Sequence, residues 1–135
     1  VLYTSTHYPA NYGFIPRTLS EDNDPLDVLV LCSEPILNQS LVRCHPIGVI
    51  TMEDSGELDE KIIALPFGDP TYAQYKSIHD LPRHITDEME HFFTVYKQLE
   101  GKKTYVTKSE DYHVAVEIIQ KSIDLYNEKF GPKNL

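Results

Sequence analysis

The hydrophobic positions of this chain change their period near Tyr72. Before that residue, short apolar runs lie between clusters of Asp, Asn, Gly and Pro, a pattern typical of strands and turns. The predicted strands cover residues 12–15, 27–32, 41–52 and 61–67. The third of these contains Pro46 and Gly48, so we expect it to bend. The first half of the chain is therefore predicted to be rich in β-structure.

Apolar residues after Tyr72 recur at three- and four-residue intervals, which predicts helices. The apolar face of the first helix is formed by Ile85, Met89, Phe92, Phe93 and Tyr96. We expect Asp80 to cap the start of this helix, with Pro82 in its first turn. Gly101 is predicted to stop it.

A second helix is predicted to follow Ser109, whose side chain can cap it, and to end at Gly131. One side of this helix carries Ala115, Ile118, Ile119, Ser122, Tyr126 and Phe130. A short strand at residues 103–107 separates the two helices. Several strands followed by helix, strand and helix indicate an α+β fold, most simply a small closed or partly closed barrel with helices packed outside.

Chain length, net charge and cysteine spacing limit the kinds of partner and the compartment that this protein can have. The chain has 135 residues, which predicts a single domain spanning residues 1–135. Its formal net charge of −9 argues against nucleic acid as the main partner, because phosphate backbones require a basic surface. No apolar run approaches the ~20 residues of a membrane span, and Cys32 and Cys44 lack a C-x-x-C partner. We therefore expect a cytoplasmic protein with two reduced thiols and no membrane partner.

Three carboxylates gather in the segment of residues 22–27, which reads DNDPLD. If the segment is extended, Asp22 and Asp24 point the same way, and Pro25 blocks a helix there. Carboxylates this close raise one another's pKa unless a cation lies between them. With Asp27 at the start of a buried strand, they form an oxygen-rich site suited to Mg²⁺, Mn²⁺ or Ca²⁺. A solvated Asp-rich turn is the alternative interpretation of this segment.

An EF-hand is excluded, because its loop requires Gly at the sixth position and Glu at the twelfth, where this chain has Asp27 and Ser33. A second acidic segment contains Asp54, Glu57 and Asp59. By itself it is more typical of a charged hairpin tip. Because each acidic segment lies at a strand end, we expect the two to open on one rim, where they could hold more than one metal.

A phosphate ligand would also require hydrogen-bond donors beside the carboxylates. Lys61 lies two residues beyond Asp59 in a predicted strand and so points the same way. Tyr96 and Lys97 end the first helix, and Tyr12 lies in the first strand. Taken singly, a tyrosine is more often a packing residue and a lysine part of a solvated face.

Five sequence blocks, read in order, resemble the family I soluble inorganic pyrophosphatases, and most closely the short bacterial and plant-type enzymes. The blocks are residues 8–13 (YPANYG), 22–28 (DNDPLDV), 43–48 (RCHPIG), 54–61 (DSGELDEK) and 91–97 (HFFTVYK). The resemblance implies an OB-like five-stranded β-barrel with flanking α-helices. It also implies hydrolysis of inorganic pyrophosphate to two orthophosphates by a water activated between Mg²⁺ ions and Asp24, with Mn²⁺ as a substitute and Ca²⁺ inhibitory.

The resemblance also implies roles for individual acidic residues. Asp22, Asp27 and Asp59 would bind the tightest metal, and Asp27 would bridge to a second one. Asp54 and Asp59 would bind metals that arrive with substrate. Asp24 would accept the proton of the attacking water.

The same resemblance assigns the phosphate-binding side chains. These are Tyr12, Lys61, Tyr96 and Lys97, with Tyr8 supporting the site. The partners implied are pyrophosphate and phosphate. The family contains monomers, dimers and hexamers, which leaves a homo-oligomer open.

The family pattern also has a Glu, a Lys, another Glu and an Arg before its Y-P-x-N-Y-G block, in strands that would precede Val1. We therefore expect the chain to lack part of the N-terminal strands of the barrel. Alone, it is expected to be weakly active or inactive and prone to associate, because a sheet short of strands exposes pairing edges. Two other function classes stay open, a metal-binding module without catalysis and an OB-like interaction domain.

Overall fold

The computed structural model describes residues 10–33, 36–37, 39–54, 56–99, 101 and 104–131. The elements, in chain order, are strands β1 (Ala10–Ile15), β2 (Leu26–Leu31), β3 (Cys44–Asp54) and β4 (Glu57–Pro66), the 3₁₀ helix η1 (Ile78–Asp80), helix α1 (Arg83–Leu99), strand β5 (Thr104–Asp111) and helix α2 (Tyr112–Phe130). The predicted strands at residues 12–15 and 27–32 therefore differ from β1 and β2 by two residues or fewer at each end. The chain start, residues 1–9, lies outside the described ranges.

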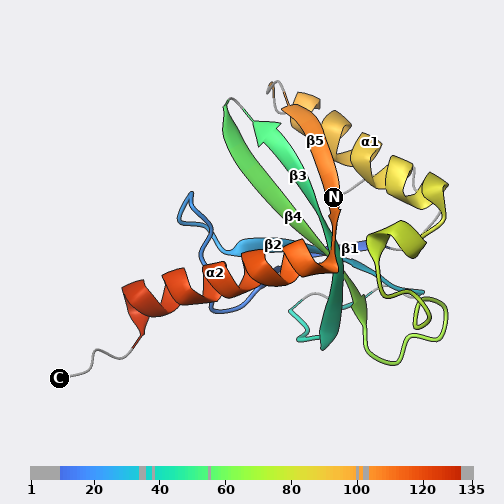
Figure 1. Cartoon of the computed structure of the whole chain (residues 1–135), viewed down its shortest axis with the longest axis horizontal. Helices are drawn as coiled ribbons and strands as arrows, with labels where there is room; N and C mark the ends of the chain where they lie inside the picture. The colour runs from blue at the N-terminus through green and yellow to red at the C-terminus, as the bar shows by residue number, and fades with distance from the viewer. Residues whose placement is uncertain are drawn as a thin grey trace.

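The five strands form one mixed sheet in the order β1-β2-β4-β3-β5. Neighbouring strands are antiparallel except β2 and β4, which are parallel. Five strands with two long flanking helices confirm the predicted α+β class. In the ranges that the structure describes, β1 and β5 occupy the two ends of the strand order, so the sheet is open (Figure 1).

The two long helices cover opposite faces of this sheet. Successive residues of β2 and β4 point to opposite faces, and both faces are buried. Leu29 and Ile63 pack in the core that contains the α1 residues Met89 and Phe93. The neighbouring positions on these strands pack in a second core, with Ala115 of α2. Figure 1 shows α1 beside β5, and α2 starting at the end of β5 and crossing the sheet from there. Odd-numbered positions on β2 and β4 thus face α1.

The predicted bend in the third strand is present. The pairing register between β3 and β4 shifts between Pro46 and Gly48, which marks a bulge. A Cβ at Gly48 would lie 2.6 Å from Cβ of Ile78 and 2.7 Å from the carbonyl oxygen of Glu110. Glycine is therefore required where η1 and β5 approach the strand most closely. At the other end of β3, Asp54 pairs with Glu57 and Gly56 has a φ of 86°, in agreement with the predicted turn.

Both predicted helix caps were wrong. Ser109 pairs with Ile50 in the sheet, which extends β5 to Asp111, and the carboxylate of Asp111 caps α2 by accepting from the Tyr112 amide. Asp80 ends η1 instead of starting α1. Local capping preference pointed to the wrong residue in both places. The sequence pattern had not predicted that β5 continues past Ser109, or that a separate 3₁₀ helix contains Asp80.

No helix in the described ranges combines the length and the apolar character that crossing a lipid bilayer requires.

Candidate active site

The centre of the candidate site is an ion pair between two neighbouring strands. Asp27 of β2 and Lys61 of β4 are direct register partners in the parallel pair, and Lys61 Nζ lies 2.5 Å from Asp27 Oδ2. Because both positions are odd-numbered, they lie on the α1 face of the sheet. The Lys61 side chain is 6% exposed, against 34% for Asp27, so the ammonium is buried beneath a carboxylate that reaches solvent.

A second carboxylate converges on the same ammonium. Asp59 lies two residues before Lys61 on β4, and its Oδ1 is 3.2 Å from Lys61 Nζ. This distance agrees with the prediction that residues two apart in a strand share a face. Burial alone would lower the pKa of Lys61, but its contacts with Tyr12 and the two carboxylates outweigh that effect and raise it. Lys61 therefore stays protonated between Asp27 and Asp59.

Tyr12 covers this ion pair from β1. The Lys61 Nζ atom lies 5.4 Å from the centre of the Tyr12 ring, which in turn meets Phe93 of α1 edge-on at 6.4 Å between centroids. Burial raises the pKa of the Tyr12 hydroxyl to about 12, against the opposing effect of Lys61. Tyr12 thus keeps its proton at neutral pH and can donate a hydrogen bond.

The first acidic segment forms a tight turn, so the alignment of Asp22 with Asp24 that an extended segment would give does not apply. Asn23 has a φ of 68°, in the left-handed region that Asn tolerates, and its amide donates to the Ser20 carbonyl at 3.0 Å. The carboxylate of Asp22 accepts from the Asp24 amide at 3.0 Å. The side chains of Asp22 and Asp24 are both exposed.

Ser20 is the residue in this turn that the sequence analysis missed. Its hydroxyl contacts Asp22 Oδ1 at 2.5 Å and the Asp24 carbonyl oxygen at 2.8 Å. Partial burial opposes the change, but these hydrogen bonds and the Asp24 amide lower the pKa of Asp22. Serine two residues before an Asp-rich segment is a recognisable turn signal and could have been identified from the sequence.

The structure brings together only part of the predicted site. Asp27, Asp59, Lys61 and Tyr12 contact one another as described, and Asp22 lies within electrostatic range of Lys61. The carboxylate of Asp24 lies on the exposed turn. The side chains of Asp54, Tyr96 and Lys97 are outside the described part of the molecule, although their backbones lie in β3 and α1, and Tyr8 is outside it altogether.

The donor chemistry of this group fits a hard cation. Two carboxylates from different strands already converge on one positive charge, and carboxylate oxygens are the preferred ligands of Mg²⁺. Among the residues that the structure describes, no three His, Cys, Asp or Glu side chains are grouped closely enough to form a complete metal site. A divalent ion held by Asp27 and Asp59 would need further oxygen ligands, from water, substrate or another carboxylate.

Comparison with known proteins places this geometry in context. Residues 1–127 match the sequence profile of the family described as inorganic pyrophosphatase. Soluble inorganic pyrophosphatase 1 of Arabidopsis thaliana is 49% identical over 128 residues, which cover 95% of this chain and 60% of the relative. Soluble inorganic pyrophosphatase 2 of Chlamydomonas reinhardtii is 43% identical over 135 residues, covering 100% of this chain and 70% of the relative.

Solved structures agree with the sequence comparison. The inorganic pyrophosphatase of Helicobacter pylori superposes with a TM-score of 0.85 at 44% identity, over 94% of this chain and 76% of that chain. The enzyme of Thermus thermophilus gives a TM-score of 0.85 at 38% identity, over 94% and 75%. The chain thus spans 60% of the length of the Arabidopsis relative and about three quarters of these two structures.

Proposed function

This chain belongs to the inorganic pyrophosphatase family, and on that premise we propose that its site hydrolyses pyrophosphate to two orthophosphates with Mg²⁺ as the cofactor. The family is metal-dependent. The observation that carries the proposal is the convergence of Asp27 and Asp59 on Lys61, which sets anionic ligands beside a buried cation. A site for a metal–pyrophosphate complex needs both signs of charge within a few ångströms.

Asp24 is proposed to take the proton of the attacking water at its carboxylate. The water oxygen forms a bond to one phosphorus, and the bridging oxygen leaves with the second phosphate and takes up a proton. Asp24 is exposed on a turn in which its backbone carbonyl accepts from the Ser20 hydroxyl and amide, so the carboxylate is reachable and its backbone is held in place. A positioned general base of this kind contributes typically about 10²–10⁴-fold to a rate.

Lys61 and Tyr12 are proposed to bind the phosphate oxygens. The ammonium of Lys61 balances charge that spreads over the phosphoryl oxygens in the transition state. The hydroxyl of Tyr12 keeps its proton, because burial raises its pKa to about 12, and can therefore donate to the same oxygens. Tyr96 and Lys97 are proposed to contribute further donors from the last turn of α1, and Tyr8 to support the site.

Asp22, Asp27, Asp54 and Asp59 are proposed to hold the metal ions. When bound, Mg²⁺ supplies positive charge that activates water and stabilises both phosphates. The exposed carboxylate of Asp22 has one oxygen engaged by Ser20 and the Asp24 amide, which orients the other. Cys32 and Cys44 are thiols and not a disulfide, which supports the proposal that the protein works in the reducing cytoplasm.

Phosphate release from pyrophosphate, measured across a Mg²⁺ titration, tests this function. We expect weak release from the chain alone, dependent on Mg²⁺ and above the rate without protein, and its fall to the rate without protein in the Asp24→Asn variant. The exposed Asp124→Asn variant on α2 is the matched control and is expected to release phosphate at the unmodified rate.

The alternative of a metal-binding module without catalysis gives a different result in the same experiment. Calorimetric titration would then show Mg²⁺ binding to both the unmodified chain and Asp24→Asn, while neither releases phosphate. That outcome would overturn the hydrolase proposal. Weaker Mg²⁺ binding in Asp27→Asn and Asp59→Asn, with Asp24→Asn retaining binding, would support the assigned division of roles.

A further inference from the structure

Helix α2 makes three contacts with residues 19–24, the turn that carries Asp22 and Asp24 and is called the acidic turn below. The turn and the helix are far apart in sequence. The amide of Leu19 donates to the carbonyl of Ser122 at 3.0 Å. Lys121 Nζ lies 2.9 Å from Glu21 Oε1, across 100 positions of the sequence. Lys129 Nζ lies 3.4 Å from Asn23 Oδ1, across 106 positions. These contacts reach the residues on both sides of Asp22.

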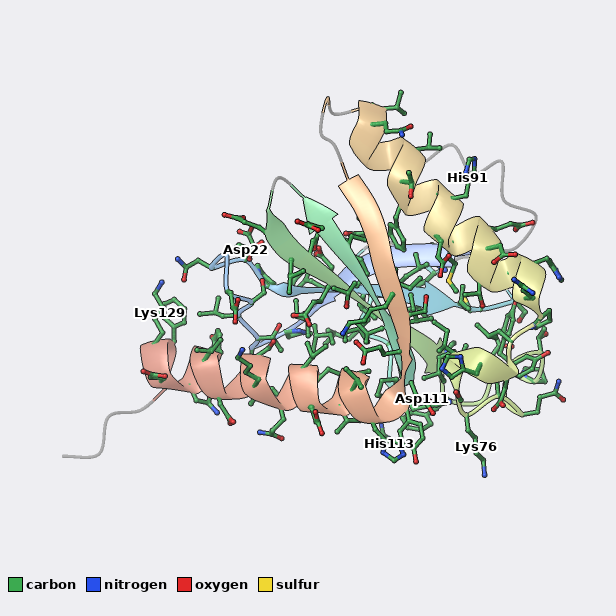
Figure 2. The ribbon with its side chains drawn as sticks, turned by 45° about the horizontal axis from the view of Figure 1, so that its top comes forward. Asp22, Lys76, His91, Asp111, His113 and Lys129 are labelled. Atoms are coloured by element: carbon green, nitrogen blue, oxygen red, sulfur yellow. The ribbon has the colours of Figure 1, made fainter. Side chains whose placement is uncertain are left out.

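Figure 2 shows Asp22 above the C-terminal half of α2, on the same side of the molecule as Lys129. Between the turn and the helix lies a groove of about 520 Å³. Its lining includes Leu19, Glu21 and Asn23 from the turn and Lys121 and Lys129 from α2. The acidic turn and α2 are separated by this groove and do not pack together along their whole length. The polar contacts at the rim of the groove therefore set the distance between the turn and the helix.

Lys121 also compensates charge between the turn and the sheet. It lies within electrostatic range of Glu60 on β4 as well as in contact with Glu21. Glu21 and Glu60 repel each other across this gap. The ammonium of Lys121 offsets part of that repulsion between the turn and the strand that carries Asp59.

We propose that Lys121 and Lys129 of α2 are positioning residues for the acidic turn, and that they hold Asp22 and Asp24 in the geometry needed for divalent-cation binding. The inference rests on the proposed function, because it takes Asp22 as a metal ligand. Neither lysine contacts the metal or substrate. Each acts through a neighbour of Asp22, Lys121 through Glu21 and Lys129 through Asn23.

The first test measures the turn itself, without metal. The amides of Leu19, Ser20, Asn23 and Asp24 are hydrogen-bonded within the turn or to α2, so their hydrogen–deuterium exchange reports its opening. We expect exchange of these amides to be about threefold faster in Lys121→Gln and in Lys129→Gln, as for the loss of one surface contact. Lys121→Arg is expected to retain the protection. The Thr71 amide, which donates to Asp69, is the internal reference and should not change.

The second test uses the sign of the change in Mg²⁺ affinity. Removing a positive charge near an acidic turn would strengthen cation binding if charge alone mattered. Loss of positioning has the opposite effect, and we expect about threefold weaker Mg²⁺ binding in each variant and about tenfold in the double variant. Calorimetry at ~0.15 M salt screens the long-range charge effect. Lys108→Gln, which removes an exposed lysine paired with Glu110 on β5, is the matched control.

The outcomes separate this inference from the proposed function. If Asp22→Asn binds Mg²⁺ like the unmodified chain, Asp22 is not a ligand and the positioning inference is overturned, whereas the hydrolase proposal is decided by phosphate release. If Asp22→Asn weakens binding while Lys121→Gln and Lys129→Gln change neither turn exchange nor affinity, only the positioning role is overturned. Faster turn exchange with weaker binding in both lysine variants, and neither in Lys108→Gln, supports it. Thermal unfolding of each variant, expected at the unmodified temperature, excludes global destabilisation as the cause.

Discussion

Lys61 and Asp27 are register partners in the parallel strand pair and meet at 2.5 Å between Nζ and Oδ2, although 34 positions separate them in the sequence. The contact joins a 6% exposed ammonium to a 34% exposed carboxylate. A charge this deeply buried is tolerated only when it is paired. The site therefore depends on an ion pair for which the parallel arrangement of β2 and β4 is a precondition.

Replacing Lys61 tests that dependence. In Lys61→Met the hydrocarbon volume is kept while Asp27 and Asp59 lose their shared cation, so the free energy of unfolding should fall by about 2 kcal/mol. Urea denaturation followed by circular dichroism measures the change. Lys108→Met, at an exposed ion pair, should stay within about 0.5 kcal/mol of the unmodified protein. Equal stability of the two variants would show that the buried pair contributes nothing.

Ser20 holds the acidic turn from within, whereas Lys121 and Lys129 hold it from α2. Ser20→Ala removes the hydroxyl that contacts Asp22 Oδ1 and the Asp24 carbonyl oxygen, so we expect Mg²⁺ binding to weaken about fivefold. Calorimetric titration measures this, with Ser40→Ala at another exposed serine as the control. An unchanged dissociation constant in Ser20→Ala would mean that the turn holds its shape without the hydroxyl.

Gly48 is predicted to be intolerant of any side chain. In Gly48→Ala the new methyl group would meet the backbone oxygen of Glu110, which cannot move without disturbing β5, and we expect a loss of about 2 kcal/mol in unfolding free energy. Gly13→Ala is the matched control, because its Cβ would approach only Val28, at 4.0 Å. Thermal denaturation of the two variants compares them, and a Gly48→Ala protein as stable as Gly13→Ala contradicts the argument.

Asp111 gives a pH-dependent contribution to stability. Hydrogen bonds from Ser77 and from the Tyr112 amide lower the pKa of Asp111 in the folded chain below its unfolded value of about 3.9. Its stabilisation is therefore fully present above the unfolded pKa and is lost as the pH falls through the folded pKa. The melting temperature of Asp111→Ala should lie a few degrees below that of the unmodified protein at pH 6.

The same difference should shrink when both proteins are melted below pH 4. Asp124→Ala, at an exposed position on the same helix, should melt like the unmodified protein at both pH values. A melting difference for Asp111→Ala that is independent of pH would show that the carboxylate charge does not contribute.

The helical and strand regions were largely predictable, because burial imposes periods that the sequence displays. The face of α1 that packs on the sheet contains Ile85, Met89 and Phe93, as the three- and four-residue intervals indicated. The predictions failed at the ends of elements. Ser109 is as good a cap as Asp111 on local grounds, and only its pairing with Ile50 in the sheet decided between them.

That Asp59 and Lys61 share one face could be predicted from the residues alone, because residues two apart in a strand do so in any fold, and the acidic segments were recognisable from their composition. The position of Asp27 beside Lys61 and the contact of α2 with the turn around Asp22 depend on how the whole chain packs. Periodicity shows which side of an element is buried, whereas packing selects the partner across the sheet.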